Sequence, residues 1–245
     1  MDDFRRAVGF LTIVPLRATD TWTPETLGRS MAYYPLVGVC LGLALWLLYL
    51  LLQAVVPRAI TMVVLLGGLT VCTGGLHLDG LADTVDGFSR GKSREDTLRL
   101  FKEPHVGAVA VAGVALMLLL KQASLQALPH QATLSALVLM ATLSRYSMVQ
   151  LACLSRYARA SGGLGAPFVH GIQRTHLRIA ALLTVGTAGL FGGWHGLLLW
   201  GLISLMTLGY QWYFHRCLGG ITGDILGATN ELNEALVLLY MTILY

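Results

Sequence analysis

The sequence predicts an all-α protein, a polytopic membrane bundle of about seven transmembrane helices. Hydrophobic residues make up 55% of the 245-residue chain and charged residues only 12%, whereas about 25% of the residues of a soluble domain are charged. The mean hydropathy is +0.66. Apolar runs recur along the chain at close to the ~17–25 residues that cross a bilayer as a helix. We therefore expect a single integral-membrane domain, residues 1–245, solvated mainly by lipid.

Seven apolar runs mark the expected helices in chain order. An interfacial segment precedes them, because Pro15 breaks the apolar stretch of MDDFRRAVGFLTIVP. The short joins VVPRAI, LPHQ and GGWH each separate two runs, and polar loops at 87–106 and 154–178 are longer. The runs are residues 35–56, 60–76, 107–128, 131–153, 178–193, 196–214 and 225–245. Four cysteines lie far apart in or beside these runs, so we expect reduced packing residues.

The basic residues predict how the helices are oriented. The net charge is +4, but fourteen of the seventeen Lys and Arg residues fall in four places that this topology puts on one side. Basic loops favour the cytoplasm, so we expect that side and the N-terminus to be cytoplasmic and the C-terminus to lie outside. The charge thus reflects topology, and we expect no nucleic-acid partner. The four places are the N-terminal segment (Arg5, Arg6, Arg17, Arg29), the 87–106 loop (Arg90, Lys92, Arg94, Arg99, Lys102), the 154–178 loop (Arg156, Arg159, Arg174, Arg178) and Arg216.

Six of the thirteen acidic residues sit in two short stretches, each of which follows a Gly-Gly pair. The first stretch is GGLHLDGLADTVDGF, residues 74–88, and the second is GGITGDILGATNELNE, residues 219–234. In the first, the acids are spaced i, i+4 and i+7, so on a helix all three face one way. Like charges at that spacing repel each other, which indicates a purpose other than folding. The six acids are Asp79, Asp83 and Asp86, then Asp224, Glu231 and Glu234.

The second stretch places acids at depth in the membrane. Only eleven residues follow Glu234, too few to span alone, so the last helix must begin near Asp224. Glu234 is then about 15 Å deep at ~1.5 Å per residue. A carboxylate there costs ~2.5 kcal/mol or more, so it must face a cavity, a cation or a basic partner. The neighbouring Asn230 and Asn233 favour a wet, protein-lined cavity.

Oxygen ligands without cysteine favour a hard cation. Mg²⁺ commonly takes one or two carboxylates together with substrate phosphates. We therefore expect Mg²⁺ as the cofactor, held for a phosphorylated substrate. The expected ligands are Asp79, Asp83, Asp86 and Asp224. The alternative is that the acids cap helices or pair with loop arginines, but capping uses only one or two residues at a helix end.

Substrate phosphates also need cationic partners. Arg156 and Arg159 lie in SRYARASGGLG, residues 155–165, where arginine and glycine-rich backbone suit an anion. Loops on the cytoplasmic side are also basic for topological reasons alone. Both explanations, substrate binding and topology, therefore stay open for these two arginines. Arg145 lies inside an expected membrane helix and should pair with a submerged acid or with the ligand. His77 stands beside the first acids and either touches substrate, orients a carboxylate or is an ordinary buried histidine.

Five segments carry a family resemblance. GGLHLDGLADTVDGF, SRYARASGGLG and GGITGDILGATNELNE, with the early FLTIVP and YYPLVGVCLG, resemble the cobalamin synthase family, the adenosylcobinamide-GDP ribazoletransferases. The likeness runs through nearly the whole chain in order and length. It implies a multi-pass enzyme of the cell inner membrane that joins adenosylcobinamide-GDP to α-ribazole or its 5'-phosphate, releases GMP and needs Mg²⁺. Where the family often shows GxxG, this chain reads GAVA at 107–110.

The resemblance implies roles for the acids and their neighbours. Mg²⁺ on the first three aspartates would bridge the pyrophosphate, and the second acid cluster would hold another cation or act as base, although the two roles are exchangeable. The expected catalytic residues are Asp79, Asp83, Asp86, Asp224 and Glu231. The expected substrate-binding residues are His77, Arg145, Arg156, Arg159, Asn230 and Glu234. Expected partners are the two substrates, the lipid bilayer, and either other corrinoid-pathway enzymes or further copies of the chain.

Two other functions are compatible with parts of the pattern. DGLADTVDG is similar to the aspartate-rich motif of CDP-alcohol phosphotransferases, although Asp83 follows Ala82 where that motif has arginine. A lipid alcohol would then be the acceptor. A cation transporter would also use intramembrane acids. A transporter predicts acids spread along several helices, whereas here they gather in two segments near the cytoplasmic side.

Overall fold

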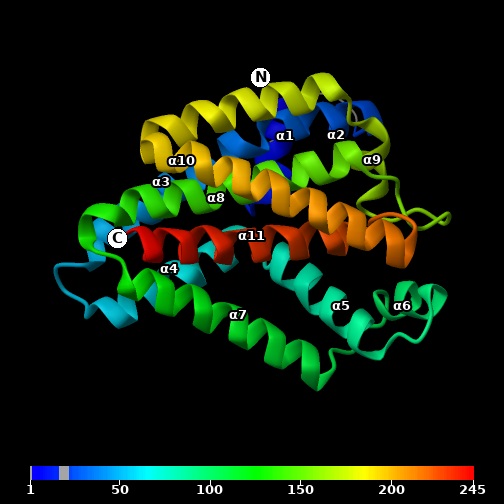
Figure 1. Ribbon diagram of the computed structural model, residues 1–245, viewed down its shortest axis with the longest axis horizontal. Helices are drawn as coiled ribbons and strands as arrows, with labels where there is room; N and C mark the ends of the chain where they lie inside the picture. Colours follow the sequence, from blue (N-terminus) through cyan, green and yellow to red (C-terminus); the bar gives the residue numbers. More distant parts are fainter. Residues whose placement is uncertain (1, 17–21) are drawn as a thin grey trace.

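The chain folds into a bundle of helices whose long members run roughly along one direction (Figure 1). The computed structural model describes residues 2–16 and 22–245, and all its regular elements there are helices, apart from an isolated bridge between Tyr157 and Ile221. The all-α prediction is therefore confirmed. The elements are α1 (Asp2–Leu11), α2 (Pro24–Ser30), η1 (Met31–Tyr33), α3 (Tyr34–Leu52), α4 (Arg58–Cys72), α5 (Leu76–Arg90), α6 (Arg94–Leu100), α7 (Ala108–Ala127), α8 (His130–Leu154), α9 (Ala166–Gly171), α10 (Arg174–Leu218) and α11 (Gly223–Leu244).

Helix α8 is the centre of the bundle. Almost every residue from Ala132 to Ala152 is buried, and α3, α10 and α11 pack around it (Figure 1). A helix that is buried all round needs no polar face, which explains why this run shows no amphipathic pattern. The neighbouring helices instead leave many large apolar side chains exposed, among them Leu51, Leu116 and Leu190. Such a surface fits a lipid bilayer.

Helix α10 consists of two halves that meet at Gly193. This glycine has φ 55° and ψ −137°, which is not helical, and the two halves lie side by side in Figure 1. Just beyond it, a Cβ atom on Gly196 would lie 2.0 Å from the carbonyl oxygen of Ala188. The expected runs 178–193 and 196–214 therefore form the arms of one tight reversal.

The expected count of seven membrane helices is not confirmed. By length and composition, four helical segments of the described chain can cross a membrane: Pro24–Leu52, Ala108–Ala127, His130–Leu154 and Arg174–Leu218. The pair α4 and α5, bent by 90°, makes a fifth if it is one broken span. The difference has physical reasons, because α4 has only 15 residues and four polar residues between Asn230 and Glu234 interrupt the apolar pattern of α11.

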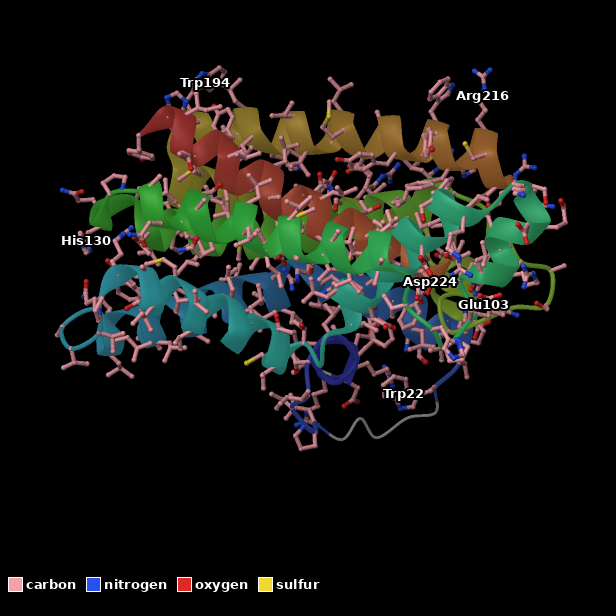
Figure 2. The ribbon with its side chains drawn as sticks, turned by 90° about the horizontal axis from the view of Figure 1, so that it is seen from below. Trp22, Glu103, His130, Trp194, Arg216 and Asp224 are labelled. Atoms are coloured by element: carbon pink, nitrogen blue, oxygen red, sulfur yellow. The ribbon has the colours of Figure 1, made fainter. Side chains whose placement is uncertain are left out.

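The two ends of the bundle differ in charge. His130 and Trp194 lie at one end, whereas Glu103, Arg216 and Asp224 lie at the other (Figure 2). The second end also holds α6 and the 155–165 loop (Figure 1), so three of the four basic places gather there. We call it the basic end. The C-terminus lies at the opposite end. Of the fourth basic place, Arg17 falls within residues 17–21, outside the described residues.

All four cysteines are free.

Candidate active site

Each acidic stretch opens on a glycine with positive φ that ends or turns the preceding helix. Gly74 and Gly75, with φ of 60° and 71°, form the bend between α4 and α5. Gly219, with φ 72°, ends α10. Residues with a side chain are disfavoured in this left-handed region, whereas glycine adopts it freely. The Gly-Gly pairs in the sequence thus turn the chain, so that α5 and α11 can approach each other.

Helices α5 and α11 cross in very close contact at two glycines. A Cβ atom on Gly80 would lie 2.7 Å from the carbonyl oxygen of Asp224, and one on Gly227 would lie 3.2 Å from that of His77. Side chains at these two positions would force the backbones apart. Their absence brings Asp79 on α5 next to Asp224 on α11, two acids 145 positions apart in the printed sequence.

A short backbone pairing adds an arginine to this crossing. The Ala158 N–H donates to the Ile221 carbonyl at 2.8 Å, and the Ile221 N–H donates to the Arg156 carbonyl at 2.9 Å. The 155–165 loop is thereby fixed to the start of α11. From this loop the Arg159 guanidinium forms an ion pair with Asp224 Oδ2 at 3.3 Å and lies 5.8 Å from the centre of the Phe101 ring.

These residues form what we call the outer cluster: Asp79, Asp83, Asp224 and Arg159. Its charge is not balanced. The carboxylates of Asp224 and Asp79 repel Asp83, and the Arg159 guanidinium attracts it. Within residues 2–16 and 22–245, neither Asp79 nor Asp83 has an ion pair or a side-chain hydrogen bond. One guanidinium thus faces three carboxylates, and this excess of negative charge favours a cation.

The outer cluster fits Mg²⁺ only as a shared site. No group of three or more His, Cys, Asp or Glu residues is arranged to hold a metal in the described part of the chain. Mg²⁺ is often bound by one or two carboxylates together with substrate phosphates and water, without an all-protein cage. Asp79 and Asp83, which are unpaired, together with Asp224, whose Oδ2 is engaged by Arg159, have the donors for that mode.

Asp86 has a different environment from the other two aspartates of α5. It is buried, and its Oδ2 accepts hydrogen bonds from Arg90 at 2.7 Å and from the Gly107 N–H at 3.2 Å. Its Oδ1 is buried without a partner among the described residues. The predicted trio therefore shares one helix, but Asp86 fastens the start of α7, where the sequence reads GAVA, while Asp79 and Asp83 remain unpaired.

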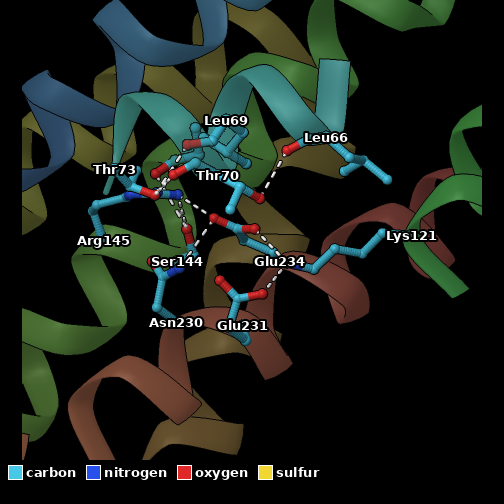
Figure 3. A network of polar contacts seen from close by, with 11 residues as sticks. Leu66, Leu69, Thr70, Thr73, Lys121, Ser144, Arg145, Asn230, Glu231 and Glu234 are labelled. Atoms are coloured by element: carbon cyan, nitrogen blue, oxygen red, sulfur yellow. Dashed lines mark hydrogen bonds and ion pairs between the residues drawn. The ribbon is translucent and has the colours of Figure 1, made fainter. Parts of the chain in front are cut away.

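The second pair of acids lies deeper in the bundle and is neutralised. Glu234 Oε2 and Glu231 Oε2 accept hydrogen bonds from the Lys121 ammonium at 2.5 and 2.6 Å, and Arg145 donates to Glu234 Oε1 (Figure 3). All four side chains are at least 93% buried. We call these four residues the inner cluster. Asn230 also donates to Glu234 Oε1, at 3.0 Å.

The inner cluster contains two cations and two carboxylates, so it carries no net charge. Isolated ions at this depth would be very costly, whereas paired and hydrogen-bonded ions are tolerated. The cavity beside it measures about 10 Å³, close to the minimum volume for one water molecule. Asn233 has no side-chain hydrogen-bond partner among the described residues. The wet interior expected around Glu234 is thus very small, and a basic partner accounts for this acid.

Lys121 is the residue that the sequence analysis missed. It comes from α7, is 2% exposed and bridges both glutamates of α11. A signal was available, because a single lysine inside an apolar run of membrane length is costly unless it is paired. Arg145, which was expected to pair with a submerged acid or the ligand, contacts Glu234.

The two remaining predicted residues, His77 and Arg156, lie in different places relative to the outer cluster. His77 is 2% exposed and, with Asp79 and Asp224, lines a cavity of about 110 Å³. Arg156 is exposed, and its charge acts on His215 of α10. The structure thus brings Arg159 to the acids and leaves Arg156 pointing elsewhere, although both come from one loop.

An open groove borders the outer cluster at the basic end. It measures about 490 Å³ and lies between α6 and the 155–165 loop, with Arg159, Arg94, Arg99 and Lys102 among its lining residues. Arg94 is also structural, because it donates to the carbonyls of Leu218 at 2.7 Å and Ala158 at 3.1 Å. A hydrogen bond from Arg99 holds the pKa of the nearby Asp96 carboxyl below its ordinary value. A basic groove beside unpaired carboxylates is suited to phosphates.

Comparison with known proteins gives the family of the chain. The family model described as cobalamin-5-phosphate synthase matches residues 3–242. A relative from Geotalea daltonii is 41% identical over 95% of this chain and 94% of its own length. One from Syntrophobacter fumaroxidans is 38% identical over 96% of both chains, and one from Pseudomonas fluorescens is 40% identical over 95% of this chain and 96% of its own. All three are named adenosylcobinamide-GDP ribazoletransferase. No solved structure matches. The matches over nearly the whole length show that the chain belongs to the cobalamin-5-phosphate synthase family.

Proposed function

We propose that this chain is an adenosylcobinamide-GDP ribazoletransferase that acts in the assembly of the nucleotide loop of cobalamin. It joins adenosylcobinamide-GDP to α-ribazole or its 5'-phosphate and releases GMP. Family membership over residues 3–242 supports the reaction. The observation that carries the site is the outer cluster, in which Asp79, Asp83 and Asp224 meet with only Arg159 to balance them.

The reaction forms one bond and breaks another at the same phosphorus. A ribose hydroxyl oxygen of the acceptor bonds to the phosphorus nearer the corrinoid, the bond from that phosphorus to the GMP phosphate breaks, and GMP leaves with the electron pair. The hydroxyl proton passes to a carboxylate. We assign this base to Asp79 or Asp224, because Glu231 and Glu234 are held by Lys121. Positioning and charge neutralisation supply most of the catalysis in such transfers.

Asp79, Asp83 and Asp224 would hold the Mg²⁺ ion, which when bound supplies positive charge to the pyrophosphate and the departing phosphate. Asp86 is the fourth ligand expected from the sequence, and its buried, unpartnered Oδ1 keeps it a candidate. Arg159 lines both the cluster and the basic groove, where it is placed to bind phosphate oxygens. We assign Arg156 no direct contact with the substrate, because it is exposed and its charge acts on His215. The inner cluster positions α11 through Glu231, Glu234, Arg145 and Asn230.

The proposed setting is the cell inner membrane, with the basic end in the cytoplasm. The four apolar segments support a membrane protein, and basic residues gather at the end that holds the outer cluster. By the positive-inside rule this end faces the cytoplasm. Labelling of single cysteines in the 155–165 loop checks the orientation, because a loop that reacts only from outside would reverse it.

Release of GMP tests the function directly. The purified chain is incubated with adenosylcobinamide-GDP and α-ribazole, and GMP is measured with and without Mg²⁺. We expect GMP only when both substrates and Mg²⁺ are present, with activity lost in excess chelator and restored by Mg²⁺. Full activity in chelator would remove the metal from the proposal. CMP release from a CDP-linked donor would instead favour the CDP-alcohol phosphotransferase. Cation flux into vesicles without nucleotide would favour the transporter. The family match favours neither of these two functions.

A further inference from the structure

The cavity of about 110 Å³ next to the outer cluster has an aromatic wall. Phe10 of α1, Tyr34 of α3 and Phe168 of α9 line it, and Met148 of α8 adds to the apolar surface. The rings of Phe10 and Phe168 have centroids 4.3 Å apart, and those of Phe10 and Tyr34 are 6.3 Å apart with an interplanar angle of 14°. We call this cavity the aromatic pocket. Four helices, α1, α3, α8 and α9, contribute to this wall.

The opposite wall of the aromatic pocket is polar. Asp79 of α5 and Asp224 of α11 line it together with the glycines at which these helices cross. Carboxylates accept hydrogen bonds from ribose hydroxyls, as they do in dinucleotide-binding folds. One pocket therefore combines apolar walls suited to a flat ring with acceptors suited to a sugar. That is the chemistry of a nucleoside.

Two residues that line the pocket each carry a buried polar atom without a hydrogen-bond partner among the described residues. The hydroxyl of Tyr34, whose side chain is 1% exposed, and Nε2 of His77, which is 2% exposed, form no hydrogen bond with any described residue. Unpartnered buried groups are costly and rare, so each calls for a partner. In a pocket of about 110 Å³, roughly ten times what one water needs, that partner has room to be a ligand.

We infer that the aromatic pocket binds the base of the acceptor riboside, with Tyr34 and His77 on the side of its free ring nitrogen and the ribose towards Asp79 and Asp224. The inference rests on the proposed function. The donor's guanine is the competing occupant. Guanine has several donors and acceptors along its edges, and most of them would lose hydrogen bonds against walls such as Phe10 and Phe168. An apolar bicyclic base with one free ring nitrogen would lose few hydrogen bonds in the same place.

The pocket reaches the surface beside the arginine of the outer cluster. Leu164 lines it and is 89% exposed, so the 155–165 loop, which carries Arg159, forms its mouth. An acceptor can thus enter from the basic end. The phosphates of the donor would meet its ribose at the carboxylates, since Arg159 lines the basic groove on the other side.

Removal of one hydroxyl tests the inference. Tyr34→Phe deletes a group that makes no hydrogen bond within the described protein, so packing and thermal stability should be kept. Equilibrium dialysis of α-ribazole against the purified full chain, with and without GDP, should show a Kd about 3- to 10-fold higher, as expected for one lost hydrogen bond. The KM for α-ribazole in the GMP-release assay should rise in parallel, with less than about twofold change in the KM for adenosylcobinamide-GDP.

The neighbouring tyrosine is the matched control. Tyr33 packs its ring on Phe4, with centroids 6.3 Å apart, and does not line the aromatic pocket. Tyr33→Phe removes the same group and should leave the Kd unchanged. As a second variant, Leu164→Trp fills the mouth from its exposed side and should weaken α-ribazole binding without a loss of stability.

The outcomes separate this inference from the proposed function. If Tyr34→Phe weakens the binding of α-ribazole but the wild type releases no GMP, the transferase function fails and the pocket assignment stands. If GMP is released but Tyr34→Phe leaves the Kd and KM for α-ribazole unchanged, the pocket assignment fails alone. Displacement of α-ribazole by guanosine, or no binding of α-ribazole to the wild type with or without GDP, also overturns it.

Discussion

The outer and inner clusters use the same kinds of side chain, but the inner cluster is neutral and the outer cluster has an excess of negative charge. In the inner cluster, Lys121 and Arg145 match Glu231 and Glu234 one for one, and all four are buried. In the outer cluster, three carboxylates share Arg159, and Asp79 is exposed. Each cluster includes acids of α11, and Asp224 of the outer cluster lies seven and ten residues before Glu231 and Glu234 of the inner cluster. A buried group that is balanced needs nothing further, whereas an unbalanced group at a cavity requires a ligand.

The sequence does not reveal this difference, and the two sets of acids look alike there. Charge balance depends on cations contributed by other helices, and the sequence spacing of the acids says nothing about them. Lys121 is 110 positions from Glu231 and Arg145 is 89 from Glu234. The comparison is testable, because substitutions in the inner cluster should act mainly on stability and those in the outer cluster mainly on turnover.

The largest effect is expected from removal of the inner-cluster lysine. Lys121→Met leaves two buried carboxylates with Arg145 alone, and loss of one partner of a buried ion pair typically costs about 3–5 kcal/mol. Reversible unfolding in mixed micelles should show this loss of unfolding free energy. The double variant Lys121→Met/Glu231→Leu removes one charge of each sign and should recover much of it. If Lys121→Met is as stable as the wild type, the inner cluster has no structural role.

In the outer cluster, Asp83→Asn should act on turnover. The substitution keeps the shape of the side chain but removes a negative charge that Asp224 and Asp79 repel. Loss of a ligand's supporting partner costs 10–100-fold, so loss of the ligand itself should cost at least about 100-fold in kcat, or about 2.7 kcal/mol, and raise the Mg²⁺ requirement. Stability should be kept or improved. Asp96→Asn on α6 is the control, and a wild-type rate in Asp83→Asn would remove this residue from the site.

The crossing that creates the outer cluster is also open to a test. In Gly80→Ala the new Cβ meets the backbone of Asp224 and of Gly227, at 2.7 and 3.2 Å, so α5 and α11 must separate. Such overpacking typically costs about 1–3 kcal/mol, and turnover should fall further because the acids move apart. Gly67→Ala on α4 is the control, since its Cβ meets nothing within 4 Å. Equal unfolding free energies and rates in both variants would contradict the close crossing.

The smallest effect separates the two arginines of one loop. Arg159→Ala should raise the KM for adenosylcobinamide-GDP about 10-fold, because a charge-assisted hydrogen bond contributes roughly 1.5–3 kcal/mol. Arg156 acts on His215 instead, so Arg156→Ala should change the KM less than about threefold. Steady-state kinetics on both variants provides the measurement. A similar loss in both would place Arg156 at the substrate after all.

The sequence alone determined the class of protein and most of the polar residues that matter. Composition and run lengths predicted a helical membrane protein, and the two Gly-Gly stretches marked the acids, because few charged residues occur in such a chain and each is costly. The run boundaries also located α3, α7 and α8 closely. The expected number of spans is not confirmed, because composition does not show that α4 has only 15 residues or that Gly193 joins two runs as the arms of one reversal.

Only the tertiary structure decided which acids belong together. It placed Asp224 with Asp79 and Asp83 and grouped Glu231 and Glu234 with Lys121, although the sequence assigned Asp224 to the glutamates. It also assembled the aromatic pocket from Phe10, Tyr34 and Phe168. The physical reason is that hydrophobic periodicity reports which face of a helix is buried. It does not report which partner covers that face, because helix packing depends on small residues and loop geometry that act across long stretches of chain.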